Sequence, residues 1–366
     1  MKKLIRPCIH KIKPYQPGKP IEEVAREIGV EKVESIIKLA SNENPLGPSP
    51  RALAAVQPVL SCVNLYPDGS AYYLKQALSG KLKLPAECII VGNGSNEIIE
   101  LIMHVFVGAG HKVVYAHPSF LVYRLVATMF GAEAVEVPLK GFVHDLPAML
   151  RAIDSKTRVV IIANPNNPTG TALPPAELER FLRLVPDSVI VVLDEAYYEY
   201  LPPELRFNAL PWLEQKKVIL LRTFSKIYGL AGLRIGFGLA SEECVEILNR
   251  VRQPFNTSSL AQAAARGALE DAEHVKRTLE NNQKGLEMLG KGFRQLDLEY
   301  VPSVANFILV RVGEAKRVFH RLLEKGIIVR PMDFYDLPEY LRITVGLPEE
   351  NERLLRELEV VLKEDR

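Results

Sequence analysis

One lysine stands in an unusual setting in the stretch LRTFSKIYGLAGLRIG, residues 221–236. Lys226 lies among small and apolar residues, glycines follow it, and Arg234 comes eight positions later. Most lysines are solvated surface residues, and their amines stay protonated at neutral pH. A lysine that is desolvated near another positive charge loses its proton more readily and can act as a nucleophile. The setting of Lys226 indicates a reactive amine, provided that other polar groups accompany it.

Further polar clusters follow apolar runs elsewhere in the chain. The run VVIIA is followed by NPNNPTG at residues 164–170, and the run VIVVL is followed by DEAYYEY, which begins at Asp194. In GNGSNEIIELIMHVF, glycines and Ser95 precede an apolar helix. The free N–H groups at the start of such a helix bind anions, phosphate especially.

The elements that must position these clusters are short, regularly spaced apolar runs. They begin near Val113, Ala134, Arg158, Ser188 and Lys217, and their length and β-branched content predict fully buried strands. Helical patterns such as LPPAELERFLRLV, with prolines in the first turn, lie between them. Alternating strands and helices predict an α/β fold with a parallel sheet covered on both faces. Ligands bind at the carboxyl ends of such strands, so the clusters are expected to converge on one edge.

Each cluster alone also has an ordinary interpretation. NPNNPTG contains the residues that form turns, and an aspartate after a strand often caps a turn. GNGSNE departs from the dinucleotide-binding fingerprint, which requires glycine where Glu97 stands, and no GxxxxGK[ST] motif occurs in the chain. The order of the clusters and their joint placement at one sheet edge favour a functional site.

Composition limits the classes of protein. The 366 residues exceed one ordinary core, so we expect a large domain and a smaller one. The 46 basic and 44 acidic residues nearly balance, which argues against a nucleic-acid partner. The absence of a secretion signal and of an eighteen-residue apolar run predicts a cytoplasmic protein without membrane spans. The cysteines are far apart and predict neither metal ligands nor disulfides: Cys8, Cys62, Cys88 and Cys244.

Together, NPNNPTG, LDEAYY and TFSKIYGLAGLRIG resemble the fold type I pyridoxal 5'-phosphate enzymes of the aspartate aminotransferase superfamily. A finer resemblance, to the histidinol-phosphate aminotransferases, extends over nearly the whole chain. It rests on KLASNENPLGPSP, VNLYPDGSAYYLKQAL, GNGSNEIIEL, NPNNPTGT, LDEAYYEY, RQPFNTSSLAQAAA, VPSVANFILV, GIIVRPM and YLRITVG.

This resemblance implies the domain organisation. The large domain would carry a mostly parallel seven-stranded sheet, and a smaller α/β domain would accompany it. We expect an N-terminal arm and part of the small domain in residues 1–45, the large pyridoxal-phosphate-binding domain in residues 46–255, and the C-terminal small domain in residues 256–366.

The resemblance also implies the groups that act on the cofactor ring. Lys226 would form the imine with the cofactor aldehyde and then carry the proton that moves during transamination. Asp194 would pair with the pyridine nitrogen and keep it protonated, so that the ring accepts electrons. Asn167 and Tyr197 would donate hydrogen bonds to the 3'-oxygen of the ring. The cofactor phosphate would be held at the helix start, by hydroxyl groups and by one cation: Gly94, Ser95, Asn96, Thr223, Ser225 and Arg234.

Residues near the two ends of the chain match the substrate side of the family's site. Arg342 in YLRITVG corresponds to the arginine that receives an anionic group of the substrate, commonly an α-carboxylate. Arg330 in GIIVRPM and Tyr15 in KPYQPG correspond to positions near the substrate phosphate. Asn44 in SNENPLG lies on the segment that closes over the site, and Asn96 departs from the aspartate of many aligned relatives.

These assignments imply a homodimeric aminotransferase with a ping-pong cycle. Glutamate would give its amino group to the cofactor and leave as 2-oxoglutarate, and the aminated cofactor would convert an imidazolyl oxopropyl phosphate to histidinol phosphate. Tyr66 in NLYPDGS would reach the cofactor phosphate of the other subunit. The alternatives are an aromatic aminotransferase or a threonine-phosphate decarboxylase of the same fold, a pyridoxal-phosphate-binding regulator, which carries an added DNA-binding domain, and a dehydrogenase.

Overall fold

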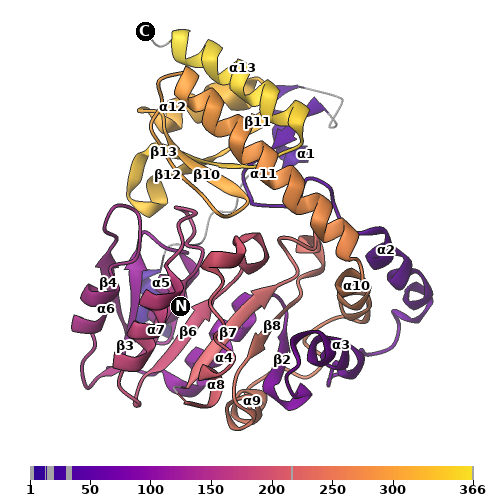
Figure 1. The fold of residues 1–366 in the computed structure, drawn as a ribbon, viewed down its shortest axis with the longest axis vertical. Coiled ribbons are helices and arrows are strands. Elements are labelled where there is room, and N and C mark those ends of the chain that lie inside the picture. The colour runs from indigo at the N-terminus through magenta and orange to yellow at the C-terminus, as the bar shows by residue number, and fades with distance from the viewer. Residues whose placement is uncertain (1–3, 13, 15–19, 30–34, 216, 365–366) are drawn as a thin grey trace.

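The computed structural model describes residues 4–12, 14, 20–29, 35–215 and 217–364. The chain forms a large α/β body and a smaller body that contains most of the C-terminal residues (Figure 1). The long helix α11 (Ala272–Gln295) runs from one body to the other. Among the described helices, none is both long enough and apolar enough to cross a membrane.

The large body is built on a seven-stranded sheet in the order β2-β8-β7-β6-β5-β3-β4. Only β8 (Gly236–Leu239) runs antiparallel to its neighbours, so the prediction of a mostly parallel sheet is confirmed. The sequence patterns had not singled out β8 or β2 (Ile89–Gly92) as strands. The remaining strands are β3 (Lys112–His117), β4 (Glu133–Pro138), β5 (Thr157–Ala163), β6 (Ile190–Asp194) and β7 (Val218–Thr223).

The prediction that every apolar run is a fully buried strand is wrong for β4. Within this strand only Val137 is buried, and Glu133 and Pro138 are exposed. β4 is one of the two edge strands of the sheet and pairs with β3 alone, so no strand covers its outer side. The central strands β5, β6 and β7 are buried along nearly their whole length, as the sequence predicts.

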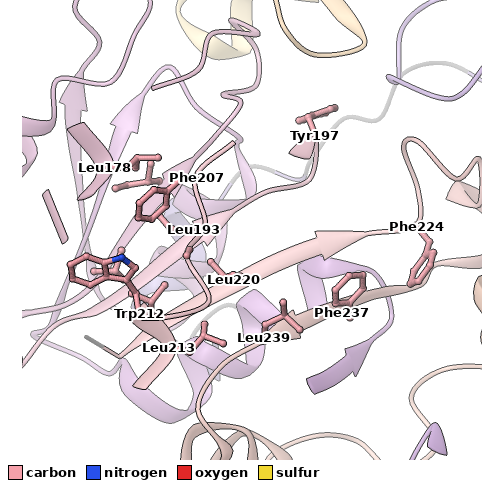
Figure 2. Packing of buried hydrophobic residues seen from close by; sticks show 14 of the residues in the cluster. Leu178, Leu193, Tyr197, Phe207, Trp212, Leu213, Leu220, Phe224, Phe237 and Leu239 are labelled. Atoms are coloured by element: carbon pink, nitrogen blue, oxygen red, sulfur yellow. The ribbon is translucent and has the colours of Figure 1, made fainter. Parts of the chain in front are cut away.

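Helices cover both faces of this sheet because successive strand side chains point to opposite sides. On one face, Val159 and Ile161 pack with α4 (Ser95–Phe106), α5 (Val122–Met129) and α9 (Glu242–Asn249). On the other face, Val160 and Ile162 pack in a larger core, part of which Figure 2 shows around Leu193 and Trp212. The helices of that face are α2 (Pro50–Val56), α3 (Tyr72–Leu82), α6 (Leu146–Arg151), α7 (Pro175–Leu184), α8 (Trp212–Gln215) and α10 (Ser259–Leu269).

The smaller body contains an antiparallel four-stranded sheet in the order β12-β13-β10-β9. These strands are β9 (Tyr300–Val301), β10 (Phe307–Arg311), β12 (Arg330–Met332) and β13 (Leu337–Thr344). Helices α11, α12 (Ala315–Glu324) and α13 (Pro348–Glu364) contribute the apolar side chains that cover it.

The N-terminal segment joins the smaller body. Its strand β1 (Ile37–Lys38) pairs with β11 (Ile327–Ile328), and α1 (Ile21–Ile28) contributes Val24 and Ala25 to a core shared with Ile328. The domain boundaries at residues 45/46 and 255/256 stay predictions.

A buried ion pair ties β6 to β7 directly beneath the edge of the sheet. Arg222 Nε lies 2.9 Å from Glu195 Oε2, and the Arg222 guanidinium lies 3.7 Å from the centre of the Tyr198 ring. Burial raises the pKa of Glu195, and the charge of Arg222 opposes that rise. Arg222 therefore compensates a carboxylate that water does not reach.

We expect Arg222→Ala to lower the free energy of unfolding by about 3–5 kcal/mol, because it leaves the buried Glu195 carboxylate unpaired. The matched control is Arg250→Ala, which removes an exposed pair between Arg250 and Glu246 at the same distance of 2.9 Å. The control is expected to change stability by at most about 1 kcal/mol. Urea unfolding of both variants measures the difference, and equal losses would contradict the role of the Arg222 pair.

Candidate active site

A cavity of about 410 Å³ opens at the carboxyl edge of the large sheet. Ala163 at the end of β5 lies beside Asp194 at the end of β6, so these strand ends meet as predicted. Eleven residues singled out from the sequence line the cavity: Ser95, Asn96, Asn167, Asp194, Tyr197, Thr223, Ser225, Lys226, Arg234, Arg330 and Arg342. Other lining residues include Ser41, Asn42, Glu43, Phe120, Tyr123 and Tyr335.

The Lys226 amine is held at the centre of this set. Its Nζ donates a hydrogen bond to the Ser41 carbonyl oxygen at 3.2 Å and lies 5.8 Å from the centre of the Tyr197 ring. Part of the side chain is accessible from the cavity, while the surrounding protein desolvates the amine. Burial, and next the positive charge of Arg342, lower the pKa of Lys226 to about 8. The amine therefore becomes neutral at a much lower pH than a solvated lysine, whose pKa is about 10.4.

Asp194 supplies a buried carboxylate to the same cavity. Burial raises its pKa, while a hydrogen bond from the Tyr123 hydroxyl to Asp194 Oδ2 at 2.6 Å acts in the opposite direction. The backbone N–H of Ala196 donates to Oδ1 at 3.2 Å. Both donors favour the ionised carboxylate, which is the form that stabilises a cationic ring nitrogen. They also fix the orientation of its two oxygens.

Tyr123 was not found by sequence reasoning. It lies on α5, which follows β3 and the segment that contains Phe120, and its side chain is fully buried. No motif marks this tyrosine. The available signal was positional, because β3 ends at the same edge of the sheet as β5 and β6.

Tyr197 and the segment 40–43 form another wall of the cavity. Asn42 Nδ2 donates to the Tyr197 hydroxyl at 2.8 Å, and burial raises the pKa of Tyr197 to about 12. The segment is fixed to the smaller body, since Asn42 N donates to Thr344 Oγ1 at 2.9 Å and Asn306 Nδ2 donates to Asn42 O at 3.0 Å. Asn42 belongs to the motif SNENPLG, yet sequence reasoning had selected Asn44 from it.

Asn44, on the segment predicted to close over the site, is not among the residues that line the cavity, and its substrate contact stays a prediction. Its Nδ2 donates to the Ile227 carbonyl oxygen at 2.9 Å and to Thr278 Oγ1 at 3.1 Å. Those acceptors engage its amide group within the protein, so Asn44 fixes the segment that carries Asn42.

The start of α4 forms an anion cradle. Gly94 precedes the helix with φ of +73°, and a Cβ atom there would lie 2.6 Å from Arg234 Nη2. The absence of a side chain at Gly94 thus lets the guanidinium lie directly over the helix start. Arg234 Nη1 also lies 3.5 Å from Ser225 Oγ, and Ser225 N donates to Thr223 Oγ1 at 3.1 Å. One cation, two hydroxyl groups and helix N–H groups converge here, which is the donor set of a phosphate site.

Two arginines from the smaller body complete the opposite wall. Arg330 on β12 lies directly opposite Arg342 on β13, so both side chains project from the same face of this sheet. Arg342 donates from Nη1 to Asn167 Oδ1 at 2.6 Å and from Nη2 to the Ala40 carbonyl oxygen at 2.7 Å. Its buried Nε has no hydrogen-bond partner within the described residues. A buried charged donor without a partner is costly, and an anionic ligand in the cavity would relieve that cost.

Tyr66, predicted to reach the other subunit, is not among the residues that line this cavity. Its surface is 83% exposed, and its ring stacks on Phe255 at a centroid distance of 4.7 Å. Tyr15 lies outside the described residues.

The lowered pKa of Lys226 makes its reaction with an aldehyde depend on pH. We expect the rate of imine formation in the ligand-free protein to rise with pH and to level off above about pH 8, because only the neutral amine reacts. Stopped-flow absorbance of the imine over pH 6–11 measures this midpoint, where the pH limits are roughly those that bracket lysine titration. A midpoint near that of a solvated lysine would contradict the desolvation of Lys226.

Comparisons with known proteins agree with this geometry. Residues 34–358 match the family "Aminotransferase class I and II". A histidinol-phosphate aminotransferase from Methylobacillus flagellatus is 52% identical over 97% of this chain and 96% of its own length. Histidinol-phosphate aminotransferase 2 from Nitrosospira multiformis is 50% identical over 97% of this chain and 91% of its own length.

The solved structures confirm the predicted fold type I arrangement. The histidinol-phosphate aminotransferase from Sinorhizobium meliloti, in complex with pyridoxal 5'-phosphate, superposes with a TM-score of 0.91. The match covers 99% of this chain and 98% of that one, at 28% sequence identity. The chain belongs to the class I and II aminotransferases and, within them, to the histidinol-phosphate aminotransferase family.

Proposed function

We propose that this protein is a pyridoxal-phosphate-dependent histidinol-phosphate aminotransferase, which transfers the amino group of L-histidinol phosphate to 2-oxoglutarate. The observation that carries the proposal is one cavity in which the Lys226 amine and the Asp194 carboxylate face the paired arginines Arg330 and Arg342. This arrangement places a nucleophilic amine within reach of a substrate whose other end is anionic. The names of the relatives at about half sequence identity support the same activity.

The residues present fit pyridoxal 5'-phosphate. The anion cradle of Gly94, Ser95 and Arg234 would hold its phosphate, and the Asp194 carboxylate would face its ring nitrogen. When bound, this cofactor supplies an electron-accepting ring conjugated to an imine. Asn167 and Tyr197 line the same cavity and would donate to the ring oxygen, and Asn96 lies beside Ser95 at the cradle.

Lys226 and Asp194 divide the proton chemistry. The Nζ of Lys226, whose pKa burial lowers to about 8, would take the proton from the substrate carbon that bears the amino group and deliver it to the cofactor carbon that forms the imine. The ionised Asp194, oriented by Tyr123, would keep the ring nitrogen of the cofactor protonated. The Ser41 carbonyl oxygen accepts a hydrogen bond from the Lys226 amine and would help to position it for these transfers.

Arg330 and Arg342 would receive different anions in the two half-reactions. Histidinol phosphate carries a phosphate and no carboxylate, whereas glutamate carries two carboxylates, so one pocket must accept both. A pair of guanidinium groups on one sheet face does so, because each group can bind an oxyanion through two hydrogen bonds.

We further propose that the enzyme is a cytoplasmic homodimer. Large apolar side chains are exposed on the segment 53–73 and at Phe255, and exposed apolar surface of this extent is typical of an interface. A second copy of the chain is the proposed occupant, with Tyr66 reaching the cofactor phosphate of the partner. The exposed residues are Leu53, Leu60, Val63, Leu65, Tyr66, Tyr72, Tyr73 and Phe255.

The activity is tested by incubating the purified holoenzyme with 2-oxoglutarate and one amino donor at a time. Histidinol phosphate is expected to give glutamate and the imidazolyl oxopropyl phosphate. Phenylalanine and threonine phosphate serve as parallel donors. Preferential turnover of phenylalanine would assign the chain to aromatic transamination, and carbon dioxide released from threonine phosphate would assign it to decarboxylation.

Arg330→Ala should separate phosphorylated from unphosphorylated donors. Because a hydrogen bond to a charged group contributes about 1.5–3 kcal/mol, we expect kcat/KM for histidinol phosphate to fall about 10-fold to 100-fold more than kcat/KM for phenylalanine. Arg342→Ala, on the adjacent strand, serves as the comparison and should lower kcat/KM in both half-reactions. Steady-state kinetics with the two donors measure these changes. Equal losses of kcat/KM for both donors in Arg330→Ala would contradict phosphate recognition by Arg330.

A further inference from the structure

The exposed loop of residues 66–70, hereafter the Tyr66 loop, is fixed on several sides. Tyr66 stacks on Phe255, and the Asp68 carboxylate accepts hydrogen bonds from Ser70 N and Tyr72 N, both at 2.8 Å. Gln262 Nε2 donates to the Asp68 carbonyl oxygen at 2.9 Å. These contacts hold the loop that carries the exposed Tyr66 ring.

A chain of hydrogen bonds leads from this loop toward the anion cradle. Arg252 Nη2 donates to the Gly69 carbonyl oxygen at 2.9 Å, and Arg252 Nη1 donates to Asn256 Oδ1 at 2.7 Å. The amide group of Asn256 then donates from Nδ2 to Glu97 Oε2 at 2.7 Å and to the Val91 carbonyl oxygen at 3.1 Å. Asn256 thus accepts from one neighbour and donates to the next.

The chain ends on the turn that forms the cradle. Glu97 Oε2 also accepts a hydrogen bond from the backbone N–H of Asn93, between Gly92 and Gly94. The same oxygen would lie 3.2 Å from a Cβ atom placed on Gly92, so the carboxylate packs against the turn itself. Ser95 and the phosphate-binding N–H groups follow directly. The glycine turn before α4 is therefore held by a side chain that Asn256 orients.

We propose that Arg252 and Asn256 are positioning residues that couple dimer assembly to binding of the cofactor phosphate. This inference rests on the proposed function, since it requires both the cofactor and the homodimer. A partner subunit seated on the Tyr66 loop would restrict the Gly69 backbone and, through Arg252, Asn256 and Glu97, the cradle turn. Phosphate bound in the cradle would restrict the cradle turn first and, through Glu97, Asn256 and Arg252, the Gly69 backbone.

Coupling of this kind is reciprocal. If dimerisation tightens cofactor binding by some factor, the cofactor must tighten the dimer by the same factor. A structural role for Arg252 and Asn256 would lower stability or affinity without changing that factor. The coupling factor is therefore the quantity that distinguishes a coupling role from a merely structural one.

The test measures the dimer dissociation constant by sedimentation equilibrium, with and without saturating pyridoxal 5'-phosphate. For the unchanged protein we expect the cofactor to tighten the dimer by about 5-fold to 150-fold, the usual range of such coupling. In Asn256→Asp the shape is kept, but a carboxylate faces Glu97 and can no longer donate to it. The ratio of the two dissociation constants should fall about 5-fold or more below that of the unchanged protein, and the direct contact of Tyr66 with the partner's cofactor phosphate would maintain the remainder.

The matched control is Asn249→Ala, because Asn249 Oδ1 accepts from the Nε of the same arginine at 2.8 Å but lies outside the chain to Glu97. This control should retain the coupling factor of the unchanged protein. Arg252→Met provides a second break in the chain if Asn256→Asp does not fold, and circular dichroism checks the fold of each variant.

A coupling factor that is unchanged in both Asn256→Asp and Arg252→Met would overturn the inference, as would a factor of one in the unchanged protein. The donor assay described above reports on the proposed activity separately. An active dimer with unaltered coupling in the variants refutes only the coupling, whereas a protein that dimerises but does not use histidinol phosphate refutes only the proposed substrate.

Discussion

Removal of the Lys226 amine and the Asp194 carboxylate from water is the constraint on which the site depends. Burial lowers the pKa of the lysine to about 8 and raises the pKa of the aspartate. Each group is then held by hydrogen bonds, the amine by the Ser41 carbonyl oxygen and the carboxylate by Tyr123 and the backbone of Ala196. Since the surrounding protein reduces the solvation of both groups, a ligand with complementary charges gains strong interactions in this cavity.

The two bodies contribute different chemistry to the one cavity. The carboxyl edge of the large sheet carries the groups that we propose hold the cofactor and move a proton, and the antiparallel sheet carries Arg330 and Arg342. The segment 40–43 connects them, because Asn42 binds both Tyr197 and Thr344. Cations on one side and a buried carboxylate on the other give the cavity a polarity that suits a zwitterionic or phosphorylated amine.

Much of this arrangement could be predicted from the sequence, because it follows from chain order and strand polarity. The strand-end clusters at Asp194, Asn167 and Lys226 had to meet once their strands were parallel. The edge position of β4 could not be seen in its composition, because short apolar runs look alike whether one or two strands flank them. Contacts between segments far apart in the chain were also missed, because local sequence patterns do not show which distant segments meet.

Tyr123 and Asn42 illustrate those missed contacts. Tyr123 reaches Asp194 from 71 positions away, and Asn42 reaches Tyr197 from 155 positions away. No motif marks Tyr123, and the motif that contains Asn42 does not single it out from Asn44, whereas Lys226 is marked by the glycines and the arginine around it. Similarly, Asn44 and Asn42 are indistinguishable in composition, and only the packing against Ile227 and Thr278 turns Asn44 away from the cavity.

The central claim, that Lys226 is the amine that holds the cofactor, is tested most directly by borohydride reduction of the holoenzyme followed by peptide mass mapping. The account predicts that the reduced pyridoxyl group is found on Lys226 alone, since it is the lysine that lines the cavity within the described residues. The Lys226→Ala protein should bind the cofactor through the phosphate cradle but retain no label after reduction. A pyridoxyl group on any other lysine of the unchanged protein would contradict the account.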